Sequence, residues 1–186
     1  MKNILIISGH TDLNDSVANK AIIEETLRLL PHAKVVYLDK LYPDFKIDVK
    51  AEQEKLENAD IIVLQFPFFW YSMPSIMQRW IEETFKHGWS HGRTGDKLKG
   101  KKVIVSLTTG APASMYRKNE GAEHDMGEYL LPIVATCKLC QMDYLGHVLT
   151  GGVSYQTRTD ESAIKGIVEK SQEHAKRLVE VIGKLE

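Results

Sequence analysis

Five aromatic side chains lie within the six residues from Phe66 to Tyr71, where only Pro67 interrupts them. They follow Ile61–Leu64, a continuously apolar run that predicts a strand buried on both faces of a parallel sheet. Aromatic rings beside free backbone N–H groups at the carboxyl end of such a strand suit a flat, heteroaromatic cofactor, of which a flavin is the obvious example. The alternative is that the rings cap the core or form a subunit contact, and this segment alone favours that packing role.

A polar loop after the first apolar run carries groups that could bind an anion such as a phosphate. Ser16 and Asn19 lie in the first turn of a predicted helix, where backbone N–H groups lack partners, and His10 could add a charged donor. Ser16 could equally be a simple N-cap, and Asp12 and Asp15 would repel an anion if they pointed inward. The loop has neither the Walker pattern nor G-x-G-x-x-G, so nucleotide hydrolysis and a Rossmann NAD site lack support.

The loop after the fourth predicted strand, from Thr108 to Tyr116, could contact the same ligand. Gly110 allows the backbone to approach a ligand closely. The N–H groups of the loop could then donate to the pyrimidine end of a flavin, and Tyr116 could supply an O–H group. The alternative is an ordinary Gly-Pro surface loop. His87 and His91 have i,i+4 spacing but no third ligand, so we expect no metal site.

The elements that must position these loops alternate strictly between strand and helix. Right-handed crossovers then predict an α/β fold with a doubly wound, five-stranded parallel sheet in the flavodoxin-like order 2-1-3-4-5 and helices on both faces. In that order the loops after strands one, three and four meet at one edge. At 186 residues we expect a single domain, 1–186. The predicted strands are Asn3–Ser8, Lys34–Leu38, Ile61–Leu64, Lys102–Leu107 and Tyr144–Leu149, and the predicted helices are Ser16–Leu30, Asp48–Asn58, Pro74–Phe85, Glu128–Cys140 and Asp160–Leu185.

Charge and composition limit the partners and the compartment. The 24 basic and 25 acidic residues give a net charge of −1 with no basic stripe, which argues against nucleic acid as a partner and favours small molecules. The apolar run Ile4–Ile7 is too short for a signal peptide and no run approaches membrane-spanning length, so we expect a cytoplasmic protein. Cys137 and Cys140 form a C-x-x-C, but they recur with apolar neighbours at helical spacing, which predicts buried thiols rather than a redox pair.

Three segments together resemble the NAD(P)H:quinone reductases of the flavodoxin-like superfamily. They are His10 with Ser16-x-Ala18-Asn19, the run from Gln65 through Trp70-Tyr71 to Pro74, and Thr108-Thr109-Gly110. Three more, Leu41–Phe45, Ala51–Glu54 and His87-Gly88-Trp89, are similar to the small bacterial branch. That branch includes general-stress quinone reductases and the ancillary oxidoreductase subunits of glutathione-gated potassium-efflux systems. The resemblance spans nearly the whole chain.

The resemblance implies a flavin site, with FMN chosen because small relatives carry it and FAD left open. Tyr116 matches a tyrosine that assists hydride transfer in larger relatives, and His124 lies near the place of its partner histidine. Both are therefore candidate catalytic residues. The implied cofactor-binding residues are His10, Ser16, Val17, Ala18, Asn19, Pro67, Phe68, Phe69, Trp70, Tyr71, Thr108, Thr109, Gly110 and Ala111.

The resemblance also implies ping-pong transfer, in which NAD(P)H gives a hydride to the flavin and leaves before a quinone or similar acceptor takes two electrons. It also implies a homodimer. The aromatic surface that we expect around residues 66–71 agrees with such an interface. Two other roles stay open. One is a one-electron carrier, against which the net charge of −1 argues. The other is a regulatory subunit that binds a potassium-efflux transporter.

Overall fold

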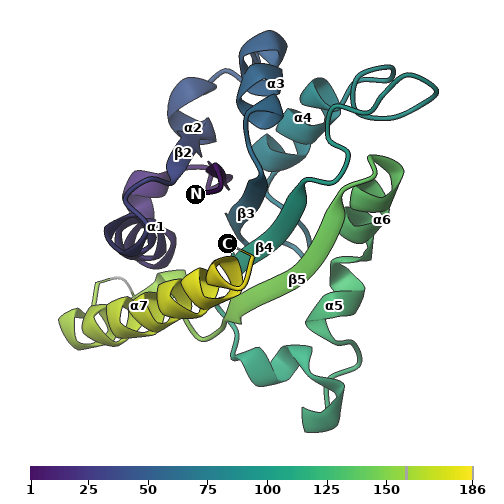
Figure 1. The fold of residues 1–186 in the computed structure, drawn as a ribbon. Helices are drawn as coiled ribbons and strands as arrows, with labels where there is room; N and C mark the ends of the chain where they lie inside the picture. Colours follow the sequence, from purple (N-terminus) through teal and green to yellow (C-terminus); the bar gives the residue numbers. More distant parts are fainter. Residues whose placement is uncertain (158, 186) are drawn as a thin grey trace.

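The computed structural model describes residues 1–157 and 159–185, and its centre is a parallel sheet of five strands (Figure 1). The order of the strands is β2-β1-β3-β4-β5, so the expected flavodoxin-like fold and strand order are confirmed. The strands are β1 (Ile4–Ser8), β2 (Lys34–Tyr37), β3 (Ile61–Pro67), β4 (Lys102–Thr108) and β5 (Asp143–Thr150).

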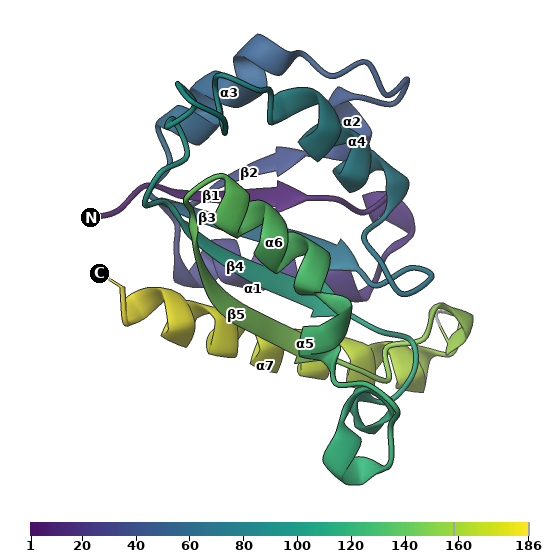
Figure 2. The same cartoon turned by 90° about the vertical axis from the view of Figure 1, so that its right-hand side faces the viewer.

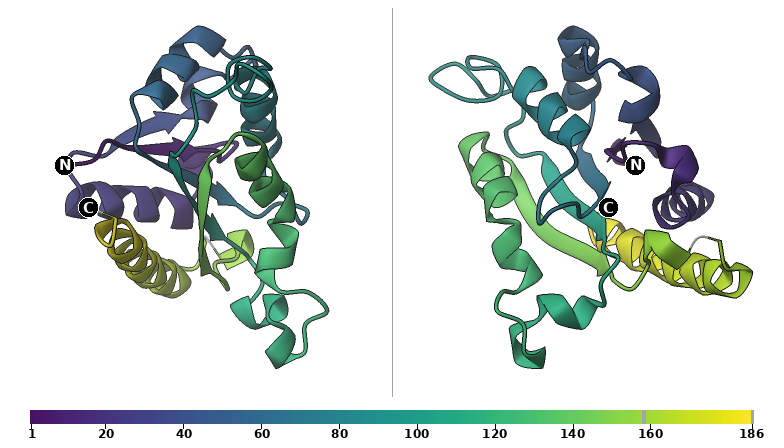
Figure 3. Two further views of the ribbon diagram at one scale, coloured as in Figure 1. Left: turned by 45° about the vertical axis from the view of Figure 1, so that its right-hand side comes forward. Right: turned by 180° about the vertical axis from the view of Figure 1, so that it is seen from behind.

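Helices cover both faces of the sheet because successive side chains of a strand point to opposite faces. In β1, Ile4 and Ile6 face an apolar cluster that α1 (Ala18–Leu29) and α7 (Glu161–Gly183) cover side by side (Figure 3). Leu5 and Ile7 face the opposite cluster. That cluster is covered by α2 (Leu38–Leu41), α3 (Val49–Glu57), α4 (Ser75–Thr84), α5 (Met126–Tyr129) and α6 (Leu131–Leu139) (Figure 2). None of these helices, over the residues described, has the length and apolar character that a membrane span requires.

Strand β3 ends three residues later than expected, at Pro67, and its additional residues are buried. Gln65 can remain inside the strand because both ends of its amide are bonded in the core. Its Nε2 donates to Asn19 Oδ1 at 2.7 Å, and its Oε1 accepts the hydroxyl of Ser106. A polar residue does not end a strand when the core satisfies it. The aromatic loop therefore begins at Phe68.

Two helix predictions are wrong in detail. The first helix begins two residues later than expected because Ser16 is extended, and its Oγ accepts the backbone N–H of Asn19 at 3.1 Å. The predicted helix at 128–140 is divided between α5 and α6 at Leu130. Pro132 is the second residue of α6, and its ring has no N–H and would clash with the carbonyl four residues earlier if the helix were continuous. Together with α2 (Leu38–Leu41), which was not expected, this division gives seven α-helices in the described part of the chain where five were expected.

Both cysteines are buried thiols, as predicted. Cys137 lies on α6 and Cys140 just after it, and neither forms a disulfide. Burial raises the pKa of the Cys137 thiol to about 12. Because the thiolate is the reactive form, this thiol is inert at neutral pH.

His174 attaches α7 to the sheet from within the core. Its Nδ1 is bonded to Thr150 Oγ1 of β5 at 2.9 Å, and its Nε2 to Ser106 Oγ of β4 at 2.7 Å. The ring is fully buried, and burial, with a smaller contribution from the charge of Arg177, lowers its pKa to about 3. The ring is therefore neutral in the folded protein, whereas a histidine in an unfolded chain has a pKa of about 6.5.

The unfolded chain binds one more proton at this position between the two pKa values, so the free energy of unfolding should fall as the pH falls through this range. From about pH 6.5 to about pH 5, His174 should lower it by about 2 kcal/mol. Denaturant titrations at the two pH values should show this loss in the parent protein. It should persist in His124→Gln, whose side chain is 46% exposed.

The loss should shrink in His174→Gln, and an unchanged pH slope in that variant would contradict the assignment. Burial also lowers the pKa values of His10 and His147. Their contributions have the same sign and are common to all three proteins, so the comparison isolates His174.

Candidate cofactor site

The carboxyl ends of four strands enclose a cleft of about 930 Å³, a volume suited to a small organic ligand. Its lining loops follow the strands at the edge toward which the arrowheads of the sheet point (Figure 2). The loops after β1, β3, β4 and β5 form its walls, so segments far apart in the sequence meet there. The lining residues are His10, Thr11, Asp12, Asp15, Ser16, Val17, Ala18, Asn19, Pro67, Phe68, Phe69, Trp70, Thr108, Gly110, Ala111, Val153, Ser154, Tyr155, Gln156 and Ile167.

All but two of the predicted cofactor-binding residues line this cleft, and the exceptions are Thr109 and Tyr71. The hydroxyl of Thr109 donates to the carbonyl of Ala111 at 2.8 Å, and its N–H donates to the carbonyl of Thr150 at 2.9 Å. Both donors of this residue therefore shape the loop itself. Its neighbour Thr108 lines the cleft, and the hydroxyl oxygen of Thr108 accepts from Asn19 Nδ2.

Tyr71 belongs to an aromatic cluster beside the cleft, formed by Phe68, Tyr71, Tyr116 and Tyr129. Tyr71 stacks on Tyr129 with ring centroids 5.6 Å apart, and Phe68, which also lines the cleft, meets Tyr116 edge-on at 5.8 Å. Burial, and then the two neighbouring tyrosines, raise the pKa of Tyr116, so its phenol keeps its proton at neutral pH. His124 packs edge-on against Tyr129 at 5.7 Å. The predicted catalytic residues, Tyr116 and His124, thus both contact Tyr129, and neither lines the cleft.

The aromatic loop makes a strained turn at Trp70 and Tyr71. Phe69 and Ser72 exchange two backbone hydrogen bonds of 3.1 and 3.0 Å, which close a two-residue hairpin turn. Its central residues have φ values of 50° and 63°, the left-handed region that favours glycine and asparagine. Each such side chain costs on the order of 1 kcal/mol. The turn leaves Trp70 94% and Tyr71 63% exposed, and strain of this kind clusters at ligand sites.

His10 is a neutral ring and does not supply the charged donor that the sequence allowed. Its Nδ1 accepts the backbone N–H of Asp12 at 3.1 Å, so its one proton is on Nε2. Burial lowers the pKa of the ring, and the nearby carboxylates of Asp39, Asp12 and Asp15 oppose this shift only in part. The ring packs edge-on against Phe69, with centroids 6.0 Å apart, which places the first loop beside the aromatic loop.

The two aspartates of the first loop are held by protein donors. Asp12 Oδ1 accepts the N–H of Asn14 at 3.1 Å, and Asp15 Oδ2 accepts the hydroxyl of Tyr155 at 2.6 Å. These bonds fix the carboxylates in place. The bond between Asp15 and Tyr155 also joins the loops after β1 and β5, both of which line the cleft.

The first turn of α1 combines several donors at the cleft. Asn19 Nδ2 donates to Thr108 Oγ1 at 3.1 Å and lies 3.5 Å from Ser16 Oγ. Val17 and Ala18 lie where a helix leaves its N–H groups without intrahelical partners, at the positive end of the helix dipole. Such a turn favours phosphate and other oxygen acceptors. The oxygen of Ser16 caps the helix, as one alternative had it, and its role in binding an anion stays a prediction.

The loop after β5 also lines the cleft, and sequence analysis gave it no role. It packs tightly on the loop after β4, since the N–H of Gly152 donates to the carbonyl of Ala111 at 2.8 Å. A side chain at Gly151 would place its Cβ 2.3 Å from the backbone nitrogen of Ala113, so only glycine fits there. The pair Gly151-Gly152 directly after a predicted strand is the signal that could have indicated this loop.

A family model described as the flavodoxin-like fold matches residues 2–175. The chain belongs to this flavodoxin-like family. General stress protein 14 from Bacillus subtilis (strain 168) is 36% identical over 181 residues, which cover 96% of each chain. The glutathione-regulated potassium-efflux system ancillary protein KefF from Enterobacter sp. (strain 638) is 38% identical over 142 residues, 76% of this chain and 79% of the relative.

Solved structures of this flavodoxin-like family include a general stress protein 14 from Treponema denticola in complex with FMN. It is 30% identical to this chain and superimposes with a TM-score of 0.84. The match covers 96% of this chain and 99% of the solved one. The resemblance to the small bacterial branch of general-stress proteins and potassium-efflux ancillary subunits is thereby confirmed.

Relieving the strained turn should stabilise the flavodoxin-like fold. In Trp70→Asn, a residue that accepts a left-handed φ replaces a side chain that makes few contacts, so the free energy of unfolding should rise by about 0.5 to 1 kcal/mol. Gln141→Asn is a matched control, because Gln141 has a φ of 58° and lies outside the cleft. Guanidinium titrations should show a similar gain in both variants. A Trp70→Asn protein no more stable than the parent would show that the turn is not strained.

Proposed function

We propose that this chain is a flavoprotein oxidoreductase that binds FMN in the cleft and passes two electrons from NAD(P)H to a quinone or a similar acceptor. The composition of the cleft carries the proposal. It combines hydroxyl, amide and helix N-terminal donors with the three aromatic residues of the loop after β3, Phe68, Phe69 and Trp70. The relative from Treponema denticola, which was solved with FMN, supports the choice of FMN over FAD.

The donors of the cleft fit a flavin mononucleotide. The hydroxyl oxygens of Ser16 and Thr108 already accept bonds from Asn19, so their protons can serve oxygen acceptors such as phosphate or carbonyl groups. The N–H groups of Val17 and Ala18 at the start of α1 favour an anionic phosphate. The aromatic side chains supply the apolar surface that a flat ring system requires.

When bound, FMN would supply the redox chemistry, because a flavin accepts a hydride and passes on two electrons. The protein would orient the partners and exclude water from the ring system. Phe69 and Trp70 stay exposed and can contact a planar nicotinamide and then a planar quinone. Gly110 and Ala111 bring backbone to the cleft, where fixed N–H groups can stabilise developing negative charge.

Anaerobic stopped-flow spectroscopy tests this function. Protein reconstituted with FMN should absorb in the visible, bleach on mixing with NADH or NADPH, and recover its absorbance when a quinone is added. Failure to bind either FMN or FAD would overturn the whole proposal. A bound flavin that neither nucleotide reduces would overturn its oxidoreductase part alone.

Tyr116 is the residue we propose for catalysis, and Tyr129 provides a matched control in the same aromatic cluster. The protonated phenol of Tyr116 could donate to charge that develops during hydride transfer, an interaction stronger in the transition state than in the ground state. In Tyr116→Phe the rate constant of flavin reduction at saturating nucleotide should fall about 10- to 100-fold, with FMN affinity little changed. Tyr129→Phe should keep the parental rate. An equal rate in both variants would reject the assignment, and the flavin site would stand.

Exposed apolar side chains support a two-fold homodimer. Trp70 and Tyr71 at the strained turn, Met115 in the next loop, and Leu131 and Leu139 on α6 are all more than half exposed in the isolated chain. Sedimentation at micromolar concentration should give twice the chain mass of 21.1 kDa. A monomer that still turns over a quinone would overturn this part of the proposal.

A second candidate role follows from the likeness to KefF. In that role the chain would bind a potassium-efflux transporter, and its turnover would be incidental. Co-purification of the tagged chain with a transporter from membranes would support it. Transport that survives in Tyr116→Phe would separate regulation from catalysis.

A further inference from the structure

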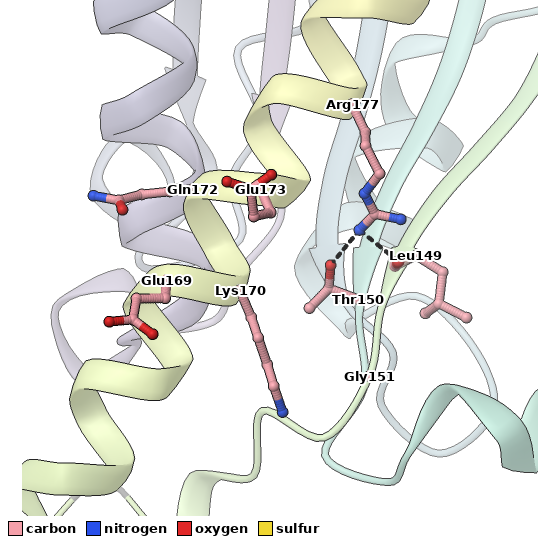
Figure 4. Close-up of a pocket in the computed structure, with 8 residues that line it drawn as sticks. All are labelled: Leu149, Thr150, Gly151, Glu169, Lys170, Gln172, Glu173 and Arg177. Atoms are coloured by element: carbon pink, nitrogen blue, oxygen red, sulfur yellow. Dashed lines mark hydrogen bonds between the residues drawn. The ribbon is translucent and has the colours of Figure 1, made fainter.

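A line of hydrogen bonds leads from the surface beside α7 into the core. Arg177 Nη2 donates to Thr150 Oγ1 at 2.7 Å and to the carbonyl of Leu149 at 3.0 Å (Figure 4). Thr150 Oγ1 is bonded to Nδ1 of His174, and Nε2 of His174 is bonded to Ser106 Oγ. The arginine lines a groove of about 630 Å³ on the outside of the molecule, whereas the histidine and Ser106 are fully buried.

The same line continues from Ser106 to the cleft. The hydroxyl of Ser106 donates to Gln65 Oε1, and Gln65 Nε2 donates to Asn19 Oδ1 at 2.7 Å. Asn19 Nδ2 donates to Thr108 Oγ1 at 3.1 Å, and both the amide and the backbone N–H of Asn19 approach Ser16 Oγ. Ser16 and Thr108 line the cleft. The chain of bonds therefore crosses the sheet and ends at the cleft that is proposed as the cofactor site.

The direction of the bonds follows from Gln65, because its side-chain carbonyl oxygen Oε1 can only accept and takes the single proton of Ser106. Because Ser106 has no second proton, the proton of the neutral His174 ring is on Nε2, and Nδ1 accepts the hydroxyl of Thr150, whose oxygen accepts from Arg177. Nε2–H donates to Ser106, which passes its proton on to Gln65. In the other tautomer Ser106 would have to give its single proton to both His174 and Gln65. Only one direction satisfies all the buried groups.

The fixed direction determines what the cleft presents. Asn19 donates to the oxygens of both Ser16 and Thr108, so their hydroxyl protons are directed to other acceptors. Over the residues that the structure describes, no protein acceptor takes either proton. Both hydroxyl groups are thus arranged as donors toward a ligand that carries oxygen acceptors.

We infer that His174 is a positioning residue, which fixes the direction of this chain of bonds so that Ser16 and Thr108 face the cofactor as donors. The inference rests on the proposed FMN site and extends it to a residue of α7 that does not line the cleft. A protonated ring would donate from both nitrogens and could not accept from Thr150. The burial that lowers the pKa of His174 keeps the ring in the form that the chain requires.

Two buried serines test the inference with the same substitution. Ser106 is part of the chain of bonds, whereas Ser171 on α7 donates to the carbonyl of Ile167 in its own helix at 2.7 Å, and both are fully buried. Ser106→Ala should raise the dissociation constant of FMN about tenfold, because the donors at the cleft lose their orientation. Ser171→Ala should stay within about twofold of the parent. Flavin fluorescence measures the dissociation constants, and thermal unfolding checks that both variants fold.

A second variant reports on the chain from the opposite end. Thr150→Val removes the hydroxyl between Arg177 and His174 and leaves the shape of the side chain. It should also weaken FMN binding, and the double variant with Ser106→Ala should be no weaker than Ser106→Ala alone, because both break one unit. Independent, additive losses would overturn the inference, as would parental affinity in Ser106→Ala or equal losses in Ser106→Ala and Ser171→Ala.

Nitrogen-15 NMR of ligand-free protein tests the same inference without a cofactor. The ring of His174 should carry its proton on Nε2, and a proton on Nδ1 would overturn the inference. A parent protein that binds no flavin would instead overturn the proposed function, and the inference with it. A parent that binds FMN while the two serine variants behave alike would overturn the inference alone.

Discussion

The hydrogen bond from Gln65 to Asn19 is the interaction on which the cleft depends. At 2.7 Å it joins the central strand to the first turn of α1 inside the core, where an unpaired amide would cost about 1 to 3 kcal/mol. It allows β3 to carry a polar residue without ending, so the strand delivers the aromatic loop beside the donors of α1. The same bond orients the amide that directs the hydroxyl groups of Ser16 and Thr108.

The floor and the rim of the cleft differ in the way they are held. The floor consists of Gln65, Asn19 and Thr108, which are buried and hydrogen-bonded to one another. Its donors are therefore in place before a ligand arrives and need no reorganisation. At the rim, Trp70 and Tyr71 are exposed and hold left-handed backbone. Two apolar clusters on the faces of the sheet provide the stability that lets the fold keep this strain. A fixed floor suits a resident cofactor, and an exposed aromatic rim suits substrates that come and go.

Apolar patterning was sufficient to predict the sheet, its order and the loops that meet at its edge. It could not predict features that depend on partners distant in the sequence. Gln65 looked like the end of a strand because Asn19 and Ser106, which satisfy its amide, are more than 40 residues away. Nothing in the sequence around His174 indicated its role, because its partners Thr150 and Ser106 are 24 and 68 residues away. The sequence allowed His10 to be a charged donor, and burial, which depends on the folded structure, lowers the pKa of its ring.

The position of FMN in a crystal structure of the complex tests most directly whether this cleft is the cofactor site. The expected result is density for FMN in the cleft, with the ring system against Phe68 or Phe69 and flavin oxygens accepting from Ser16 and Thr108. FMN bound elsewhere on the molecule would contradict the assignment of the cleft. FMN in the cleft without a hydrogen bond to either hydroxyl would contradict the role given to the buried chain of bonds.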